Sequence, residues 1–186
     1  MRVILLSGKR FVGKDAVKEI LLKLSDNSVG LSLADECKRM YAEANNLDSN
    51  RLINDRKYKE IYRNGLTKFY KQSLIENEFF FENHIKSIIE SSANDRDMIV
   101  IPDIRTKNNL TFFRTLFGDN CISIRINTDD KEKEKRGWVK TSYDSSEIET
   151  GLDMVTDWDY IISNNGTVEH LTELTTVIAH DMHNMK

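Results

Sequence analysis

A glycine- and lysine-containing stretch near the amino terminus has the spacing of a phosphate-binding loop. Gly8 is followed, after four intervening residues, by Gly13 and Lys14. In such a loop the backbone N–H groups surround a polyphosphate, the glycines allow close approach, and the lysine reaches the terminal phosphates. Asp15 stands where Ser or Thr is usual, and its carboxylate can bind a magnesium–nucleotide complex directly or through water. The pattern predicts a nucleoside triphosphate site with Mg²⁺, the alternative being an unrelated turn between a strand and a helix.

A carboxylate and a guanidinium follow a second apolar run. Pro102, Asp103 and Arg105 come directly after Met98–Ile101, which we expect to be a strand that ends there. The carboxyl ends of parallel strands face the ligand crevice of an α/β sheet, so both side chains belong at the substrate site. Asp103 is suited to hold the hydration shell of magnesium and Arg105 to bind a phosphate through two nitrogens. A surface turn held by an ion pair is the alternative.

Two cations four residues apart suggest an acceptor-binding position. Lys59 and Arg63 share one face of a predicted helix and would together bind an acceptor's phosphate. They equally fit a solvated face on which Glu60 is a partner. The spacing leaves both interpretations open.

A later cationic run surrounds Gly137 and Trp138. Arg136, beside this pair, is the candidate for a lid arginine that neutralises the migrating phosphoryl group. The neighbouring lysines are expected to be solvated, namely Lys131, Lys133, Lys135 and Lys140. Glu147 and Glu149 have the look of an acid/base pair, which is a weaker interpretation because phosphoryl transfer needs little proton transfer from the protein. His180 and His183 are read as surface histidines rather than metal ligands.

The elements that must position these residues alternate between strand and helix. Apolar runs predict five strands, at 3–6, 29–33, 98–101, 122–126 and 160–163. Helical patterns lie at 14–24, 34–44, 58–75, 80–91, 109–116 and 168–182. This alternation predicts an α/β fold in three layers, with a five-stranded parallel sheet between helices. We expect one domain over 1–186, with a helical acceptor-binding insertion at about 47–81 and a lid at about 128–157.

Composition narrows the class of protein. The 186 residues are 39% hydrophobic and 31% charged, and no apolar run has the length of a membrane span. A net charge of −3 argues against nucleic acid as a partner, because that affinity depends on many cationic contacts to phosphates. Two cysteines suggest neither a disulfide framework nor a metal site. We expect a cytoplasmic, monomeric protein without a signal peptide.

Several short motifs from different parts of the chain occur together. They are Ser7-Gly8-Lys9-Arg10 with Gly13-Lys14-Asp15, Tyr58-Lys59-Glu60 with Arg63, Phe80-Phe81, Asp103 with Arg105, Phe113-Arg114, Arg136-Gly137-Trp138, Ser146-Glu147 with Gly151-Leu152-Asp153, and Asp159 through Gly166. With them the chain resembles animal-type phosphomevalonate kinase over nearly its whole length. That family is similar in fold to nucleoside monophosphate kinases and transfers a phosphoryl group from ATP, with Mg²⁺, to the phosphate of (R)-5-phosphomevalonate.

The resemblance implies a role for each matched position. The ATP phosphates and magnesium would be bound by Lys9, Arg10, Lys14 and Asp15, and the acceptor by Lys59, Arg63 and Arg105. Arg136 would act from the lid, and Asn164 and Asn165 would form the rim of the nucleotide pocket. Two positions depart from the family, because Thr106 and Leu74 stand where arginines are common. The alternatives are a (deoxy)nucleoside monophosphate kinase, or a nucleotide-binding protein without transferase activity.

Overall fold

A computed structural model describes residues 1–92 and 95–184, in two compact units. One unit comprises Met1–Gly30 and Asp95–Lys186, and the other Leu31–Asn94. The first unit is built on five parallel strands in the order β2-β3-β1-β4-β5. These strands are β1 (Arg2–Ser7), β2 (Ser28–Gly30), β3 (Met98–Ile104), β4 (Cys121–Asn127) and β5 (Tyr160–Ser163). The predicted five-stranded parallel sheet is confirmed.

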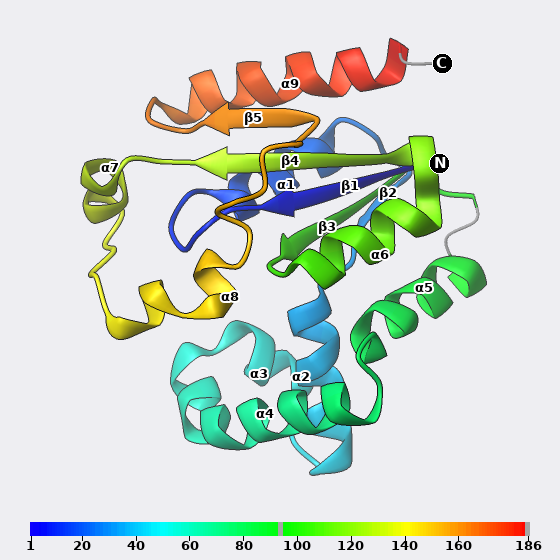
Figure 1. Cartoon of the computed structure of the whole chain (residues 1–186), viewed down its shortest axis with the longest axis vertical. Helices are drawn as coiled ribbons and strands as arrows, with labels where there is room; N and C mark the ends of the chain where they lie inside the picture. The colour runs from blue at the N-terminus through cyan, green and yellow to red at the C-terminus, as the bar shows by residue number, and fades with distance from the viewer. Residues whose placement is uncertain (93–94, 185–186) are drawn as a thin grey trace. The chain divides into compact units, whose positions relative to one another are not determined.

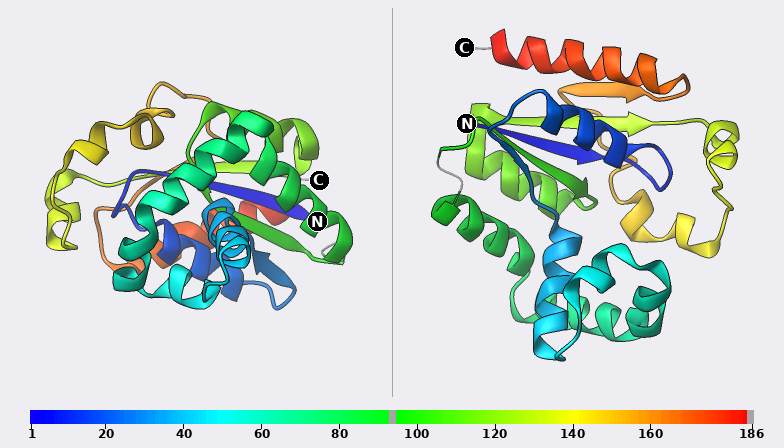
Figure 2. Two further views of the ribbon diagram at one scale, coloured as in Figure 1. Left: turned by 90° about the horizontal axis from the view of Figure 1, so that it is seen from below. Right: turned by 180° about the vertical axis from the view of Figure 1, so that it is seen from behind.

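Helices cover both faces of this sheet, which gives three layers (Figures 1 and 2). Helices α1 (Lys14–Lys23) and α9 (Val168–Asn184) pack together on one face, and α6 (Lys107–Phe117) lies on the other. One core joins apolar side chains of the sheet to those of α1 and α9, including Val17, Leu21, Leu171 and Met182. Leu110 and Phe113 of α6 are buried on the opposite side. The three-layer α/β prediction is therefore confirmed.

Strand β3 is longer than the sequence predicts, and Pro102 lies inside it. The pairing with β1 shifts by one residue here, because Leu5 pairs with Ile101 whereas Ser7 pairs with Ile104. On the other side, the pairing with β2 runs only from Ser28 to Gly30, opposite Met98 to Val100. A proline is tolerated at a bulge beyond the end of the neighbouring strand, because no ladder hydrogen bond is lost. Asp103 is consequently a strand residue, and Arg105 is the first residue after the strand.

The second unit is helical. It contains α2 (Leu33–Ala44), α3 (Ser49–Asn54), α4 (Arg56–Glu76) and α5 (Phe80–Ser92). Helix α4 begins two residues before the predicted start because the carboxylate of Asp55 accepts a hydrogen bond from the Tyr58 N–H at 3.1 Å, which caps the helix. Aromatic contacts, such as the stacked rings of Tyr70 and Phe81, hold α4 to α5.

The segment predicted as a lid contains three short helical pieces. They are α7 (Asp130–Lys135), the 3-10 helix η2 (Ser142–Ser145) and α8 (Glu147–Thr150). A further 3-10 turn, η1 (Gly118–Asn120), precedes β4. Each piece is too short to show apolar periodicity, which explains why the sequence pattern gave no sign of them. Among the described residues, no helix is long and apolar enough to cross a bilayer.

Candidate functional site

The predicted phosphate-binding loop joins β1 to α1 and needs its glycines. Gly8 and Gly13 have φ angles of +155° and +96°, which side chains rarely adopt. A β-carbon on Gly8 would also lie 2.6 Å from the carbonyl oxygen of Ile126 in β4. The loop is therefore pressed against the end of β4, and its conformation excludes larger residues at both positions.

The loop opens onto the amino terminus of α1. Gly13 is the N-cap of this helix and makes no side-chain cap, so the N–H groups of the first turn receive no capping hydrogen bond from the N-cap residue. Those groups and the helix dipole favour an anion at this position. The local structure thus fits a polyphosphate.

The carboxylates present fit a magnesium ion that is held mainly by phosphates and water. Among the described residues, no group of three or more His, Cys, Asp or Glu side chains could hold a metal by itself. Mg²⁺ bound to a nucleotide needs only one or two protein carboxylates. Asp15 is exposed in the first turn of α1, and Asp103 is half-buried in β3. Either could contribute an oxygen ligand.

Lys14 is folded back onto the loop. Its Nζ donates hydrogen bonds to the carbonyl oxygens of Gly8 at 2.6 Å and Lys9 at 2.8 Å. Burial, followed by repulsion from Arg105, lowers the pKa of Lys14 to about 8. The ammonium group lies in an environment that would gain from a bound anion.

Arg136 lies against the phosphate-binding loop. It follows α7, and its guanidinium donates hydrogen bonds to the carbonyl oxygens of Phe11 at 3.2 Å and Asn164 at 2.8 Å. The Asn164 side chain in turn donates to the carbonyl oxygen of Val12 at 2.8 Å. Asn165 accepts a hydrogen bond from the N–H of Asp129 at 2.9 Å. The lid segment, the loop and the segment after β5 therefore meet around Arg136.

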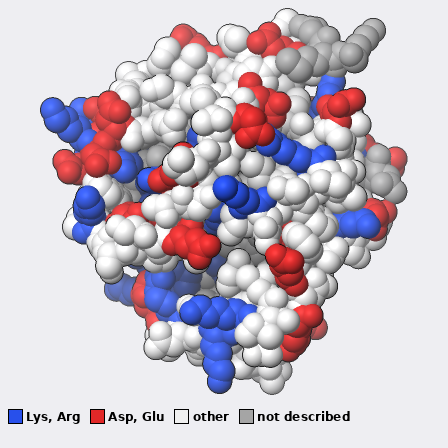
Figure 3. All heavy atoms as spheres, viewed as in Figure 1, with Lys and Arg blue, Asp and Glu red and all other residues white. Residues whose placement is uncertain are grey.

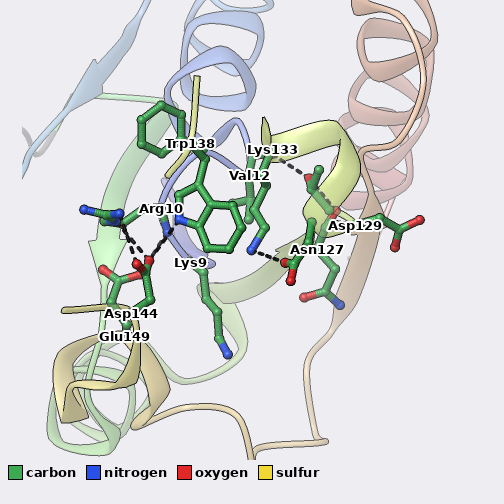
Figure 4. Close-up of polar contacts among 12 residues, drawn as sticks. Lys9, Arg10, Val12, Asn127, Asp129, Lys133, Trp138, Asp144 and Glu149 are labelled. Carbon is green, nitrogen blue, oxygen red and sulfur yellow. Dashed lines mark hydrogen bonds and ion pairs between the residues drawn. The ribbon is translucent and has the colours of Figure 1, made fainter. Parts of the chain in front are cut away.

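Arg10, which belongs to the phosphate-binding loop, also contacts the lid segment. Its Nε lies 3.1 Å from Oδ1 of Asp144, which also accepts a hydrogen bond from Trp138 Nε1 at 3.0 Å. Figure 4 shows Asp144 and Glu149 approaching Arg10 from the same side. The indole of Trp138 stacks on the ammonium of Lys133, 4.1 Å from the ring centroid.

Lys133 differs from the other lysines of the cationic run. It is only 6% exposed and forms an ion pair with Asp130 at 2.6 Å. At the corner formed by α7, basic and acidic side chains otherwise lie intermixed on the surface (Figure 3). Lys135, for example, is 70% exposed and pairs with Glu132. The expectation of a solvated lysine does not hold for Lys133, because Trp138 covers its side chain.

Glu149 and Asp153 are parts of the site to which the sequence analysis gave no binding role. Glu149 accepts hydrogen bonds from the Arg10 N–H at 2.9 Å and from Arg105 Nη1 at 2.5 Å. Asp153 lies 2.6 Å from Lys9 Nζ and 2.9 Å from Arg125 Nη2. Nothing in the spacing of two acidic residues in a charged segment distinguishes a buried carboxylate from a solvated one. For Glu149 the sequence offered only the weak interpretation as an acid/base pair with Glu147, which is exposed.

A hollow of about 350 Å³ opens beside Lys9. Its lining combines cationic, acidic and apolar side chains from β4, α7 and the segment before β5, including Lys9, Arg125, Lys133, Asp153, Leu152 and Trp158. It belongs to the same site, because Lys9 is a loop residue and Asp153 binds it.

The two candidates in the helical unit lie on α4. Lys59 is half-buried, and its pKa is lowered by burial and then by the nearby Lys38. Arg63 is exposed and pairs with Glu60, with Nε 2.6 Å from Oε2. Glu60 is thus a partner of Arg63, as the alternative interpretation of this face expected.

Comparisons with known proteins agree with this geometry. The model of the family described as phosphomevalonate kinase matches residues 6–119, a span that includes the loop, Asp103 and Arg105. A phosphomevalonate kinase of Drosophila melanogaster is 28% identical over 171 residues, which cover 89% of each chain.

Solved structures share the fold at low sequence identity. The shikimate kinase of Aquifex aeolicus has a TM-score of 0.53 at 11% identity and covers 99% of each chain. TT1252 of Thermus thermophilus has a TM-score of 0.53 at 16% identity, covering 96% of this chain and 97% of that one. A sugar kinase of Janibacter sp. HTCC2649 has a TM-score of 0.51 at 9% identity, covering 95% of this chain and 93% of that one.

Proposed function

The chain belongs to the phosphomevalonate kinase family, and from this we propose that it phosphorylates (R)-5-phosphomevalonate. The reaction would transfer the γ-phosphoryl group of ATP to the acceptor's phosphate and yield the 5-diphosphate for isoprenoid and sterol synthesis. The observation that carries this proposal is the family match across the phosphate-binding loop and the Asp103–Arg105 region, residues 6–119. The contact of Arg136 with the same loop supports it.

In this proposal the protein acts by positioning and charge. Bound Mg·ATP supplies the phosphoryl group. Lys14, Lys9 and Arg136 neutralise charge on the phosphates, while Gly8, Gly13 and Arg10 supply the loop that holds them. The acceptor's phosphate oxygen attacks in line, so little proton transfer is asked of the protein.

The remaining residues are assigned by the resemblance and by their chemistry. Asp15 and Asp103 would hold magnesium, and Arg105, with Lys59 and Arg63, the acceptor's phosphate. Asn164 and Asn165 would form the rim of the nucleotide pocket.

We also place the protein in the cytoplasm as a monomer. It would work as one kinase domain over 1–186, with an acceptor-binding arm at about 47–81 and a lid at about 128–157.

An acceptor panel tests the activity. ADP release is measured in a coupled assay with Mg·ATP and either phosphomevalonate or each of a series of nucleoside and deoxynucleoside monophosphates. Phosphomevalonate is expected to be the preferred acceptor. Turnover of a nucleotide but not of phosphomevalonate would contradict the proposal, and ATP binding without transfer to any acceptor would indicate a protein that has lost the chemistry.

A further inference from the structure

Glu149 is a fully buried carboxylate that connects two parts of the site. Its side chain is 0% exposed, whereas its neighbour Glu147 on α8 is exposed. One oxygen accepts the Arg10 N–H of the phosphate-binding loop, and the other lies 2.5 Å from Arg105 Nη1. A buried charge is retained only when it is paired and hydrogen-bonded, and here both oxygens are engaged.

Arg105 is held at both of its ends. Its backbone N–H donates to Oδ1 of Asn109 at 3.2 Å, as part of the N-terminal cap of α6. Its guanidinium is held through Nη1 by Glu149, while 31% of the side chain is exposed. The guanidinium is therefore held by Glu149 while part of the side chain stays accessible to solvent, as a phosphate-binding arginine requires.

The segment that carries Glu149 is itself docked beside Arg105. Leu152 is buried, and a β-carbon at Gly151 would lie 2.7 Å from the Glu147 carbonyl oxygen and 3.4 Å from that of Arg105. The main chain of residue 151 thus packs closely on the main chain of residue 105. This leaves the Glu149 carboxylate little freedom to move away from its partners.

We propose that Glu149 is a positioning residue for phosphoryl transfer. It fixes the guanidinium of Arg105 relative to the phosphate-binding loop, so that Arg105 meets the acceptor's phosphate at the correct place. The inference rests on the proposed function for the identity of the acceptor, but the coupling of Glu149 to Arg105 does not.

The test uses a variant that keeps the charge and moves the carboxylate. E149D withdraws the carboxylate by one C–C bond, about 1.5 Å, so that it cannot reach both Arg10 and Arg105. The same change at the exposed neighbour, E147D, is the matched control. We expect E149D to raise the KM for phosphomevalonate about tenfold through the lost contact with Arg105, and the KM for ATP by a smaller factor through the weakened contact with the Arg10 N–H. E147D is expected to match the wild type in both.

A double-mutant cycle separates positioning from general damage. In an R105Q background, E149D is expected to cause a much smaller further loss of kcat/KM for the acceptor, because the guanidinium that Glu149 positions is already gone and only the contact with the Arg10 N–H remains. Equal losses in the two backgrounds, or a wild-type acceptor KM for E149D, would overturn the inference. If circular dichroism shows that E149D is unfolded, E149Q replaces it in the same cycle, since it keeps the shape but turns one acceptor into a donor.

A binding experiment covers the case in which phosphomevalonate is not the acceptor. Inorganic pyrophosphate is titrated calorimetrically into the ligand-free protein, and the same cycle is measured as dissociation constants. If E149D weakens pyrophosphate binding several-fold in the wild-type background and much less in the R105Q background, the coupling is supported whatever the acceptor. That result together with an inactive wild type would contradict the proposed function alone, whereas wild-type affinity in E149D would overturn the role of Glu149.

Discussion

At the scale of the residue, the fold lowers the pKa of Lys14 in the phosphate-binding loop. Because burial lowers its pKa to about 8, the ligand-free protein loses this positive charge above pH 8. ATP binding then requires uptake of a proton, so the affinity for ATP should fall about tenfold per pH unit above 8. Calorimetric titration of ATP between pH 7 and 9.5 measures this. K14R is the control, because arginine stays charged throughout and should give a flatter profile; identical profiles would contradict the prediction.

Removal of the same side chain should affect catalysis more than folding. In K14A the transferred phosphoryl group loses a preorganised positive charge, and kcat/KM for ATP should fall about 10²- to 10³-fold. The coupled ADP assay measures the loss, and a thermal melt verifies that the variant is folded. Turnover near the wild-type rate would argue that Lys14 does not contact the nucleotide.

At the scale of the element, Thr106 caps helix α6 at a position where its family often has arginine. Its hydroxyl accepts the Asn109 N–H at 3.1 Å, and Asn109 Oδ1 accepts the Thr106 N–H at 3.0 Å, which closes a capping box at the start of α6. T106V should lower the free energy of unfolding by about 1 kcal/mol, because a capping hydroxyl is lost, while T106S should retain it. Urea unfolding compares the two variants. Equal stabilities would show that the cap contributes nothing.

At the scale of the whole molecule, the core between the sheet and helices α1 and α9 is one source of stability. Leu21 is 0% exposed in that core, and Leu24, at the end of the same helix, is 45% exposed. L21A should destabilise the protein by about 2–5 kcal/mol through lost burial and a cavity, and L24A by less than about 0.5 kcal/mol. Chemical denaturation in the presence and absence of ATP measures the free energy of unfolding of both variants. Similar losses in the two variants would contradict this account of the core.

The fold could be predicted from the sequence because its signals are local. Apolar runs such as 122–126 and the periodicity of 168–182 identify elements by themselves, and their alternation implies a parallel sheet. The end of β3 could not be predicted in this way, because Pro102 is tolerated there only through the bulge against β1 and the short neighbouring strand. The short helices of the lid segment could not be predicted for a different reason, because a helix of a few residues is too short to show a hydrophobic periodicity.

The sequence by itself determined the phosphate-binding loop, because all of that loop lies in one run from Gly8 to Lys14 between a strand and a helix. Tertiary structure alone decided which distant charges surround it. Glu149 lies 139 residues from Arg10 and 44 from Arg105, yet binds both. The reason is physical. The sheet order places β1 between β3 and β4, so the residues that follow these separate strands converge at one edge of the sheet. Only burial in the folded chain distinguishes the carboxylate of Glu149 from the exposed carboxylate of Glu147.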